Sequence, residues 1–310
     1  MSNVSPPPCP ITGAPPVRHV QRISPTLLKD LWRIIFKVDV TSDFAGVERF
    51  DLWESPTGLH YFSPPLAGDT GFYKSFYDGM RRRGHYPEHS IRGAFRVAAS
   101  EIGDGERVLD VGCGYGGLRT LIPHARYLGL DPNFGGEADW ACKETLEQHL
   151  ETMEGQYDVA CAFEVIEHVP DPALMVRNLA RAVRPGGRVI VSVPHVPSAL
   201  TRIPNFVLNA PPHHLTWWTD PALRAVASQA GLETEKIVAP PWCDVSSKMY
   251  WVDRFTLIKS SDVYFRHSWP IHISSMIGMA LGIAADKAFG PPKNARDEGA
   301  GLQLFARKPD

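Results

Sequence analysis

The sequence predicts an α/β fold built on a doubly wound, mostly parallel sheet. Three observations support this: four apolar runs in the middle of the chain are nearly continuous, a glycine-rich turn follows the first of them, and a helical pattern separates the last two. Nearly continuous apolar runs are typical of strands that are buried on both faces of a parallel sheet. Alternation of such strands with helices favours a doubly wound arrangement.

The regular pattern begins near residue 107, after a lead-in of different character. Residues 1–25 are rich in proline, and residues 26–100 mix aromatic residues, proline and glycine with a short possible helix at Leu27–Val38. Proline-rich stretches without apolar periodicity are typical of extended segments. We therefore expect an N-terminal extension over residues 1–95 and a main domain over residues 96–310.

The elements of the main domain follow in order. Strands are expected at Arg107–Val111, Tyr127–Leu130, Val159–Phe163, Val189–Val193, Thr234–Ala239 and Leu302–Ala306. Helical spacing and stop or cap residues predict helices at Pro172–Arg184 and from the Thr219 cap to about Ala230. Residues 243–300 exceed what a hairpin between the last two strands needs, so they are expected to form an insertion. It contains a helix at Ser268–Phe289, whose apolar side is Ile273, Met276, Ile277, Ala280 and Ile283. This side is expected to cover the substrate pocket as a lid, because the polar side is not basic, and the alternative is a helix that rests on lipid.

Composition limits the class of protein. The chain has 310 residues, 44% of them hydrophobic, and a net charge of −2, which gives no electrostatic reason to expect a nucleic-acid partner. The run Arg81–Arg83 is expected to be a solvated face. Five cysteines without a C-x-x-C pair suit a reducing compartment. Without a signal-peptide pattern or a transmembrane segment of about 20 apolar residues, a cytoplasmic protein is expected.

A glycine-rich segment, Asp110-Val-Gly112-Cys-Gly114-Tyr-Gly116-Gly117, follows the first expected strand. Glycine lets the backbone turn sharply and lets a ligand approach it closely. The Asp110 carboxylate suits an amine-bearing ligand better than a pyrophosphate. The next strand ends at Asp131, a spacing that suits an acid accepting hydrogen bonds from ribose hydroxyls. The same glycines fit the dinucleotide pattern G-x-G-x-x-G, so the loop alone leaves NAD and S-adenosylmethionine both open.

Four ordered segments resemble class I S-adenosylmethionine-dependent methyltransferases. They are RVLDVGCGYG from Arg107, Gln156–Pro172, Val183–Pro194 and His213–Leu232. The resemblance runs from about Arg107 to Gly231 and implies a Rossmann-like, seven-stranded sheet, an enzyme that transfers a methyl group, and S-adenosylmethionine as the cofactor. An NAD enzyme would require the other three segments to match by chance.

The resemblance also implies which residues hold the cofactor. Asp110, Gly112 and Gly114 line its methionine portion, and Asp131 holds its ribose. The fourth strand opens onto the cofactor at Phe163, Glu164 and Val165. Ligands of such sheets bind beyond the carboxyl ends of the strands, which agrees with this placement.

The stretch after Asp131 is shorter than in many relatives. The helix that usually follows the second strand is expected to be shortened or lost around Gly135-Gly136, and Trp140–Lys143 is expected to supply a short third strand. Glu144 then either accepts the adenine amino group or is a solvated residue at a helix start.

The extension resembles a small zinc module that precedes this domain in many relatives. Cys9–Pro15 resembles its first cysteine pair, with Thr12 in place of the second cysteine, and Trp53–Pro65 resembles its second pair, with Glu54 and Thr57 in place of cysteines. A tetrahedral zinc site requires four Cys or His ligands, so we expect no metal bound to the extension. The alternative is that Cys9 is an unrelated tail residue.

Three histidines are candidates for the acceptor side of the site. His213 and His214 lie in a proline-rich loop that resembles one near the active site of the family, and they are the predicted catalytic bases. On an extended backbone they are expected to point different ways. His168, in EVIEHVPDP, is expected to be structural or near the cofactor. The alternative for both loop histidines is no catalytic role.

The sequence leaves several functions open. The first is a methyltransferase acting on an oxygen of a small-molecule acceptor such as a sugar, a phenol or a secondary metabolite. The others are an RNA or protein methyltransferase and a non-catalytic S-adenosylmethionine-binding module. Intact Asp110, Gly112, Gly114 and Asp131 argue against the non-catalytic module.

Overall fold

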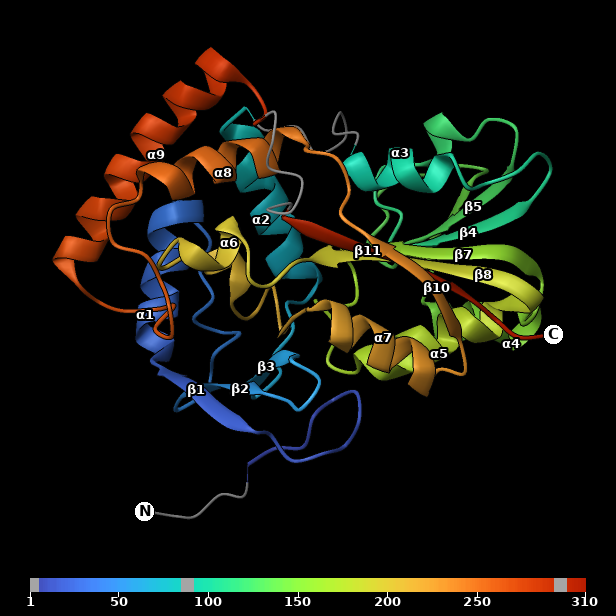
Figure 1. Ribbon diagram of the computed structural model, residues 1–310, viewed down its shortest axis with the longest axis horizontal. Coiled ribbons are helices and arrows are strands. Elements are labelled where there is room, and N and C mark those ends of the chain that lie inside the picture. Colours follow the sequence, from blue (N-terminus) through green and yellow to red (C-terminus); the bar gives the residue numbers. More distant parts are fainter. Residues whose placement is uncertain (1–5, 85–91, 293–299) are drawn as a thin grey trace.

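A seven-stranded sheet forms the centre of the main domain in the computed structural model, which describes residues 6–84, 92–292 and 300–310 (Figure 1). In spatial order its strands are β10 (Glu233–Val238), β11 (Gly301–Arg307), β8 (Val183–Pro194), β7 (Tyr157–Phe163), β4 (Arg107–Val111), β5 (Arg126–Leu130) and β6 (Ala141–Cys142). The strands from β8 to β6 are parallel, and β11 runs antiparallel to both of its neighbours. The doubly wound, mostly parallel seven-stranded sheet predicted from the sequence is confirmed.

Both faces of this sheet are covered by helices. In Figure 1, α4 (Leu146–Met153), α5 (Pro172–Ala182) and α7 (Asp220–Gln229) lie on one face and α3 (Gly93–Ala99) lies on the other. Leu109 packs in the hydrophobic cluster of the first layer, whereas Val108 packs in that of α3. Alternate residues of a strand face opposite sides, so a nearly continuous apolar run is what a strand covered on both faces requires.

The helix boundaries follow from local hydrogen bonds. The carboxylate of Asp171 accepts from the backbone N–H of Leu174 at 2.8 Å and caps α5. The hydroxyl of Thr219 accepts from that of Ala222 at 3.3 Å and caps α7. α5 ends at Ala182, two residues before the predicted boundary, because Val183 already pairs with Tyr157 in the sheet.

The connection between β5 and β6 contains turns and no helix, as the short spacing predicted. β6 has only two residues and pairs in parallel with the end of β5. This short connection leaves Asp131 and Asn133 at the carboxyl edge of the sheet.

The N-terminal part folds around a second, four-stranded sheet with the order β1-β2-β3-β9. Its strands are β1 (Arg18–Ile23), β2 (Phe50–Glu54), β3 (His60–Ser63) and β9 (Thr216–Trp217). Because β9 comes from the main domain, the N-terminal sheet is completed by the segment that directly follows the histidine loop. Between β1 and β2, α1 (Pro25–Leu31) continues as the π-helical turn η1 (Trp32–Phe36), which covers most of the predicted helix Leu27–Val38.

The remaining elements lie between and beyond the two sheets. They are α2 (Thr70–Arg82), η3 (Arg119–Leu121), α6 (Ala199–Arg202), η4 (Val207–Asn209), α8 (Asp244–Phe255) and α9 (Trp269–Phe289). The predicted insertion after residue 243 contains α8 and α9, which pack on each other and lie together in Figure 1.

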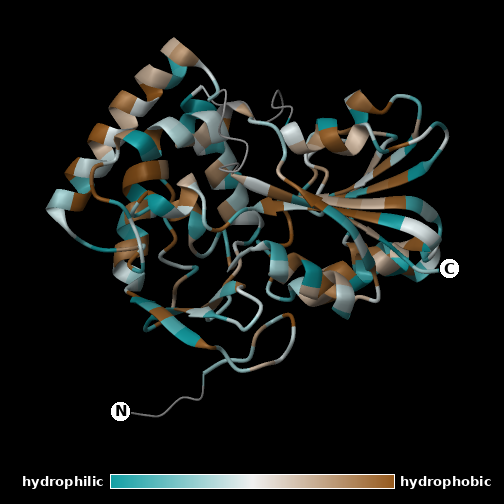
Figure 2. Ribbon diagram, in the orientation of Figure 1, coloured by the Kyte–Doolittle hydropathy of each residue, from teal (hydrophilic) through white to brown (hydrophobic). Residues whose placement is uncertain are grey.

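The helix predicted over Ser268–Phe289 is present as α9, but its apolar side is not the side that packs on α8. Its buried residues are small or polar, namely Ser274, Gly278, Gly282 and Ala285, and the two glycines contact α8. Glycine allows this close approach: a Cβ on Gly282 would lie 2.5 Å from the Cα of Val252. The large apolar residues are exposed instead, with Met276 70% and Ile273 54% accessible, and Figure 2 shows the resulting hydrophobic stretches along the helix.

Within the described part of the chain, every helix is too short or too polar to cross a bilayer. This agrees with the absence of a transmembrane segment predicted from the sequence.

Candidate active site

The glycine-rich loop leaves the carboxyl end of β4 and is tight on one side and open on the other. Gly112 has a φ of 71°, and a Cβ there would lie 2.5 Å from Cγ2 of Val165. Gly114 has a φ of 53°, and a Cβ there would meet nothing within 4 Å. The backbone therefore needs glycine at Gly112, and the open space at Gly114 leaves room for a ligand.

Asp131 follows β5 and faces this loop. Its carboxylate accepts a hydrogen bond from the backbone N–H of Gly114 at 3.1 Å and another from that of Asn133 at 2.8 Å. These two bonds fix the carboxylate in place at the mouth of the loop. Since the side chain stays partly exposed, it can also accept hydrogen bonds from a ligand.

Asp110 is the last polar group of β4 and is 2% exposed. Its carboxylate accepts a hydrogen bond from the hydroxyl of Tyr127 at 2.8 Å, and the thiol of Cys161 lies 3.8 Å away. Burial raises the pKa of Asp110 to about 7, although the bond from Tyr127 acts in the opposite direction. A cationic ammonium group at this point would stabilise the charged carboxylate, so the site fits an amino-acid tail.

Helix α2 connects the parts of the site. Arg81 donates a hydrogen bond to the hydroxyl of Tyr115 in the glycine loop. At its other end, Thr70 donates to the side-chain oxygen of Asn133 at 2.7 Å. Because α2 contacts both ligand-facing loops, it lies across the edge where the sheet opens.

Phe163, Glu164 and Val165 leave β7 at the same edge. Glu164 has a φ of 57°, and its carboxylate accepts a hydrogen bond from the hydroxyl of Ser192 at 3.2 Å. The guanidinium of Arg92 donates to the carbonyl of Phe163 at 3.0 Å. Burial raises the pKa of Glu164, while the charge of Arg92 acts to lower it. Of these residues, Val165 contacts the glycine loop directly.

The next residues of this segment meet the histidine loop. His168 Nδ1 lies 2.6 Å from the carbonyl oxygen of His213, and the backbone N–H of Leu215 donates to the carbonyl of Glu167 at 2.7 Å. The ring centroids of His168, His213 and His214 lie 4.5 to 4.8 Å from one another. The three imidazoles therefore form one cluster, which we call the histidine cluster.

The expectation that His213 and His214 point different ways is wrong. Their rings stack at 4.6 Å with an interplanar angle of 17°. The expectation assumed an extended backbone, but the N–H groups of both residues bond to the carbonyl of Ala210, which makes a turn. The indole of Trp32 holds this turn by donating to the carbonyl of Pro211 at 3.0 Å.

The histidine cluster is uncharged at neutral pH. Burial lowers the pKa of His168 to about 4 and lowers the pKa values of His213 and His214 well below the ordinary range. A general base works best when its pKa lies near the operating pH, so these imidazoles are weak bases as they stand. Their neutral nitrogens remain good acceptors and good metal ligands.

Glu167 is a candidate site residue that sequence reasoning missed. It is 0% exposed, and neither carboxylate oxygen has a hydrogen-bond partner. Oε1 lies 3.7 Å from Nε2 of His168, and burial raises the pKa of this carboxyl well above its ordinary value. The E-x-x-E-H spacing of Glu164, Glu167 and His168 was a visible signal, but nothing in the sequence showed that the second carboxylate would be buried.

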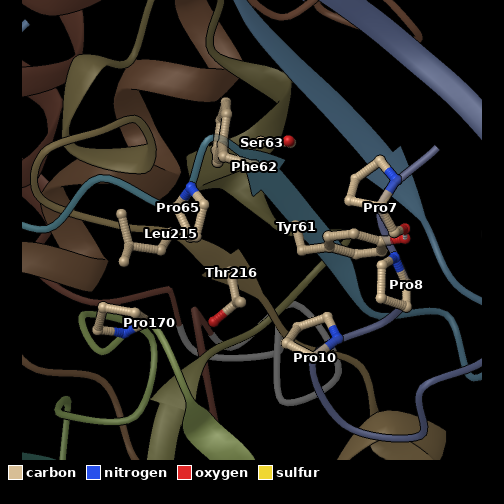
Figure 3. A pocket seen from close by; sticks show the side chains of 10 residues that line it. All are labelled: Pro7, Pro8, Pro10, Tyr61, Phe62, Ser63, Pro65, Pro170, Leu215 and Thr216. Carbon is tan, nitrogen blue, oxygen red and sulfur yellow. Dashed lines mark hydrogen bonds between the residues drawn. The ribbon is translucent and has the colours of Figure 1, made fainter. Parts of the chain in front are cut away.

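Two other features lie beside this site. Glu144, a candidate for the adenine, contacts Nδ1 of the buried His149 at 2.7 Å. A separate pocket behind the histidine loop is lined by prolines and apolar groups around Tyr61 and Leu215 (Figure 3). The Tyr61 hydroxyl is already bonded to the carbonyl of Pro7 at 2.7 Å, and the Thr216 hydroxyl accepts from the indole of Trp218 at 3.0 Å.

The fold, the open glycine loop and the adjacent carboxylates of Asp110 and Asp131 are together typical of an S-adenosylmethionine-dependent methyltransferase. The chain belongs to the methyltransferase domain family, whose model matches residues 83–237, half of the chain. The expectations of this enzyme class and cofactor are confirmed.

Curated relatives are named ubiquinone biosynthesis O-methyltransferases, in strains of Escherichia coli and in Shigella boydii. The match is 41% identical over 103 residues, and it spans 28% of this chain and 42% of the relatives' length.

Among solved structures, the chain is similar to the complex between the Haloferax volcanii Trm112 methyltransferase activator and a methyltransferase. The identity is 16% and the TM-score 0.47, with 78% of this chain and 96% of the other covered. It is also similar to the 1,6-didemethyltoxoflavin-N1-methyltransferase of Burkholderia thailandensis with bound S-adenosylhomocysteine. That match has 16% identity and a TM-score of 0.46, and it covers 78% and 87% of the two chains.

Proposed function

We propose that this methyltransferase acts on a hydroxyl oxygen of a small aromatic acceptor. The observation that carries the proposal is the histidine cluster with Glu167 at the edge where β7 and the glycine loop meet, where Glu167 and His214 are buried and the other two histidines are half-buried. A hydroxyl needs a partner that takes or shares its proton, and this group of neutral nitrogens and carboxylates offers one. The O-methyltransferase name of the curated relatives supports the same chemistry.

An aromatic acceptor is favoured by what surrounds His213. Its ring centroid lies 5.0 Å from that of Phe76, 6.0 Å from Tyr73 and 6.2 Å from Trp32. Such rings contact another aromatic ring in edge-to-face or offset geometry. Trp32 and Phe76 are themselves buried, so of these three rings the half-buried Tyr73 is the one placed to contact an acceptor, which favours a small molecule over a folded RNA or protein.

The proposal assigns the cofactor as follows. Asp110, Gly112 and Gly114 hold the amino-acid tail, Asp131 accepts hydrogen bonds from the ribose hydroxyls, and Phe163, Glu164 and Val165 line the side that faces the acceptor. When bound, S-adenosylmethionine supplies a methyl group on a positively charged sulfur. The protein positions the acceptor oxygen in line with that group and removes bulk water from it.

We also propose that residues 1–95 are a metal-free relative of the zinc module, attached to the methyltransferase domain at residues 96–310. Two turns of unequal length, at the positions that resemble the cysteine pairs, support this. In the first, the N–H of Gly13 donates to the carbonyl of Cys9 at 2.9 Å, and in the second, that of Gly58 donates to the carbonyl of Ser55 at 2.9 Å. Each turn ends at the glycine that directly follows the second aligned cysteine position, which is Thr12 in one case and Thr57 in the other. Because α2 belongs to this part, the extension also covers the cofactor edge.

A labelled-methyl assay tests the proposed reaction. Purified protein is incubated with S-adenosylmethionine carrying a deuterated methyl group and a panel of phenols, catechols, primary and secondary amines, and bulk RNA. The expected result is label on a phenolic or catecholic oxygen, found by mass spectrometry. Label on an amine or on RNA alone would contradict the proposal.

Single substitutions then test the histidine loop. His213→Ala and His214→Ala should each lower turnover with the true acceptor by about 10²–10⁴-fold while the affinity for S-adenosylhomocysteine stays within a few fold. Turnover at the native rate in both variants would remove the loop from the mechanism.

A further inference from the structure

We propose that the histidine cluster and Glu167 form a binding site for a divalent first-row metal ion, with Glu164 at its edge. This differs from the sequence-based expectation of no metal. The site itself does not depend on which acceptor is methylated, but its role in holding the acceptor oxygen rests on the proposed function.

The donor atoms of the cluster have a spacing that suits a metal ion. One ring nitrogen from each of His168, His213 and His214 lies within 4.8 Å of the other two. Ligands that are each about 2.1 Å from a metal are separated by roughly 3–4 Å. Binding one ion would therefore require the rings to rotate and draw closer, and among the described residues these histidines are the one group placed in this way.

Two of the rings are held in an orientation that metal binding requires. Nδ1 of His168 donates to the carbonyl of His213 at 2.6 Å, and Nδ1 of His214 donates to the side-chain oxygen of Asn209 at 3.2 Å. A proton held on Nδ1 leaves the lone pair on Nε2. Metal-binding histidines usually have such a partner, which fixes the tautomer and the direction of the ring.

Glu167 lacks the partners that a buried carboxylate needs. Burial of a carboxylate whose two oxygens have no hydrogen-bond partner destabilises the folded chain, because each oxygen loses its hydrogen bonds to water and forms no replacement. Arg92 donates to the carbonyl of Phe163, and the described residues give Glu167 no ion pair apart from the 3.7 Å approach of His168. A cation between Glu167 and the imidazoles would satisfy these oxygens, and it would also meet the unpartnered Nδ1 of His213 if that ring turned over.

Neither a purely structural role nor a catalytic base by itself explains all of these features. A purely structural cluster would be expected to pair its buried carboxylate, and this one does not. A catalytic base needs one histidine and a group that orients it, which explains neither three neighbouring imidazoles nor both unpartnered oxygens. Mixed imidazole and carboxylate ligands favour Mn²⁺, Fe²⁺, Co²⁺ or Zn²⁺ over Ca²⁺, whose ligands are oxygens.

The position of the site suggests what the ion does. Glu164 and Glu167 lie on the same segment as Val165, which contacts Gly112. An acceptor hydroxyl bound to the ion would have a lowered pKa and lose its proton to solvent or to a free carboxylate oxygen. The acceptor oxygen then forms a bond to the methyl carbon as the carbon–sulfur bond breaks, and that electron pair stays on sulfur.

Metal binding is measured first on protein dialysed against a chelator. Mn²⁺ is titrated into wild type, Glu167→Gln and His149→Gln, with free Mn²⁺ followed by its EPR signal and folding checked by circular dichroism. His149 is the matched control, since it is buried and contacts a carboxylate, that of Glu144, outside the cluster. We expect one saturable site in wild type and in His149→Gln, and binding at least about 100-fold weaker in Glu167→Gln. Absence of saturable binding in wild type, or equal binding in Glu167→Gln, would overturn the proposal.

X-ray absorption on the zinc-loaded wild type keeps the test valid if Glu167→Gln does not fold. The expected spectrum shows nitrogen and oxygen neighbours with the outer-shell scattering of imidazole. A sulfur neighbour would place the metal at a cysteine and overturn the proposal. The two proposals can fail separately: metal binding without hydroxyl methylation contradicts the proposed function alone, whereas hydroxyl methylation with no metal site contradicts this inference alone.

Discussion

Replacing Asp110 by Asn should change how the stability of the ligand-free protein depends on pH. Burial raises the pKa of Asp110 to about 7 in the folded chain, against about 3.9 when unfolded. Between these values the folded state holds a proton that the unfolded state has lost, so the free energy of unfolding falls as pH rises from about 4 to about 7. Above that window the burial of the charged carboxylate lowers the free energy of unfolding by its full amount, and below the window this effect is absent.

The magnitude follows from the size of the pKa shift. About three pKa units correspond to a penalty on the order of 4 kcal/mol at pH 8. Asn keeps the shape of the side chain and an oxygen that can accept from Tyr127, but it cannot ionise. The difference in unfolding free energy between Asp110→Asn and wild type should therefore move in favour of the variant by up to about 4 kcal/mol between about pH 4.5 and about pH 8. Other titrating groups cancel in this difference.

Urea unfolding of both proteins at several pH values across this window measures the difference. Saturating S-adenosylmethionine should reduce the gap at the alkaline end, because its ammonium group stabilises the charged carboxylate of wild type and binds the variant more weakly. A difference that stays constant across the window would refute the reasoning, since it would mean that Asp110 ionises as easily in the folded chain as in the unfolded one.

Three further predictions concern other parts of the molecule. Asp131→Ala should weaken S-adenosylmethionine binding by roughly 10- to 100-fold in calorimetry, because hydrogen bonds to a charged acceptor are each worth about 1.5–3 kcal/mol; native affinity in a folded variant would remove Asp131 from the site. Gly282→Ala should destabilise the packing of α8 on α9 by about 1–3 kcal/mol, since the new Cβ meets the backbone of Val252, and an unchanged thermal midpoint would contradict this packing. Cys9→Ser should leave the metal content of the purified protein unchanged in elemental analysis, whereas loss of one zinc per chain would show that the extension is a working zinc module.

Much of the main domain was predictable because its signals are local. The strand at Arg107–Val111 was predicted with the observed bounds, since a continuous apolar run ends there at a glycine turn. The cap at Thr219 marked a helix start for the same reason. Asp110 and Asp131 were placed at the edge of the sheet because the ends of parallel strands come together there.

The acceptor side was less predictable because contacts between distant segments build it. His168 and His213 are 45 residues apart in the sequence, and their meeting depends on the turn that Trp32 holds from the extension. The unpartnered state of Glu167 is likewise a result of packing. In α9, apolar periodicity located the helix but not its contact with α8, because the close approach of the two helices depends on glycines and leaves the large side chains exposed.

A crystal structure of the protein with S-adenosylhomocysteine tests the central claim most directly, because it fixes both the cofactor site and the side on which methyl transfer occurs. We predict ribose hydroxyls on the Asp131 carboxylate, the amino-acid tail beside Asp110 and Gly114, and the sulfur facing Glu164 and the histidine cluster. A sulfur that faces away from His213 and His214, or a ribose without contact to Asp131, would contradict it.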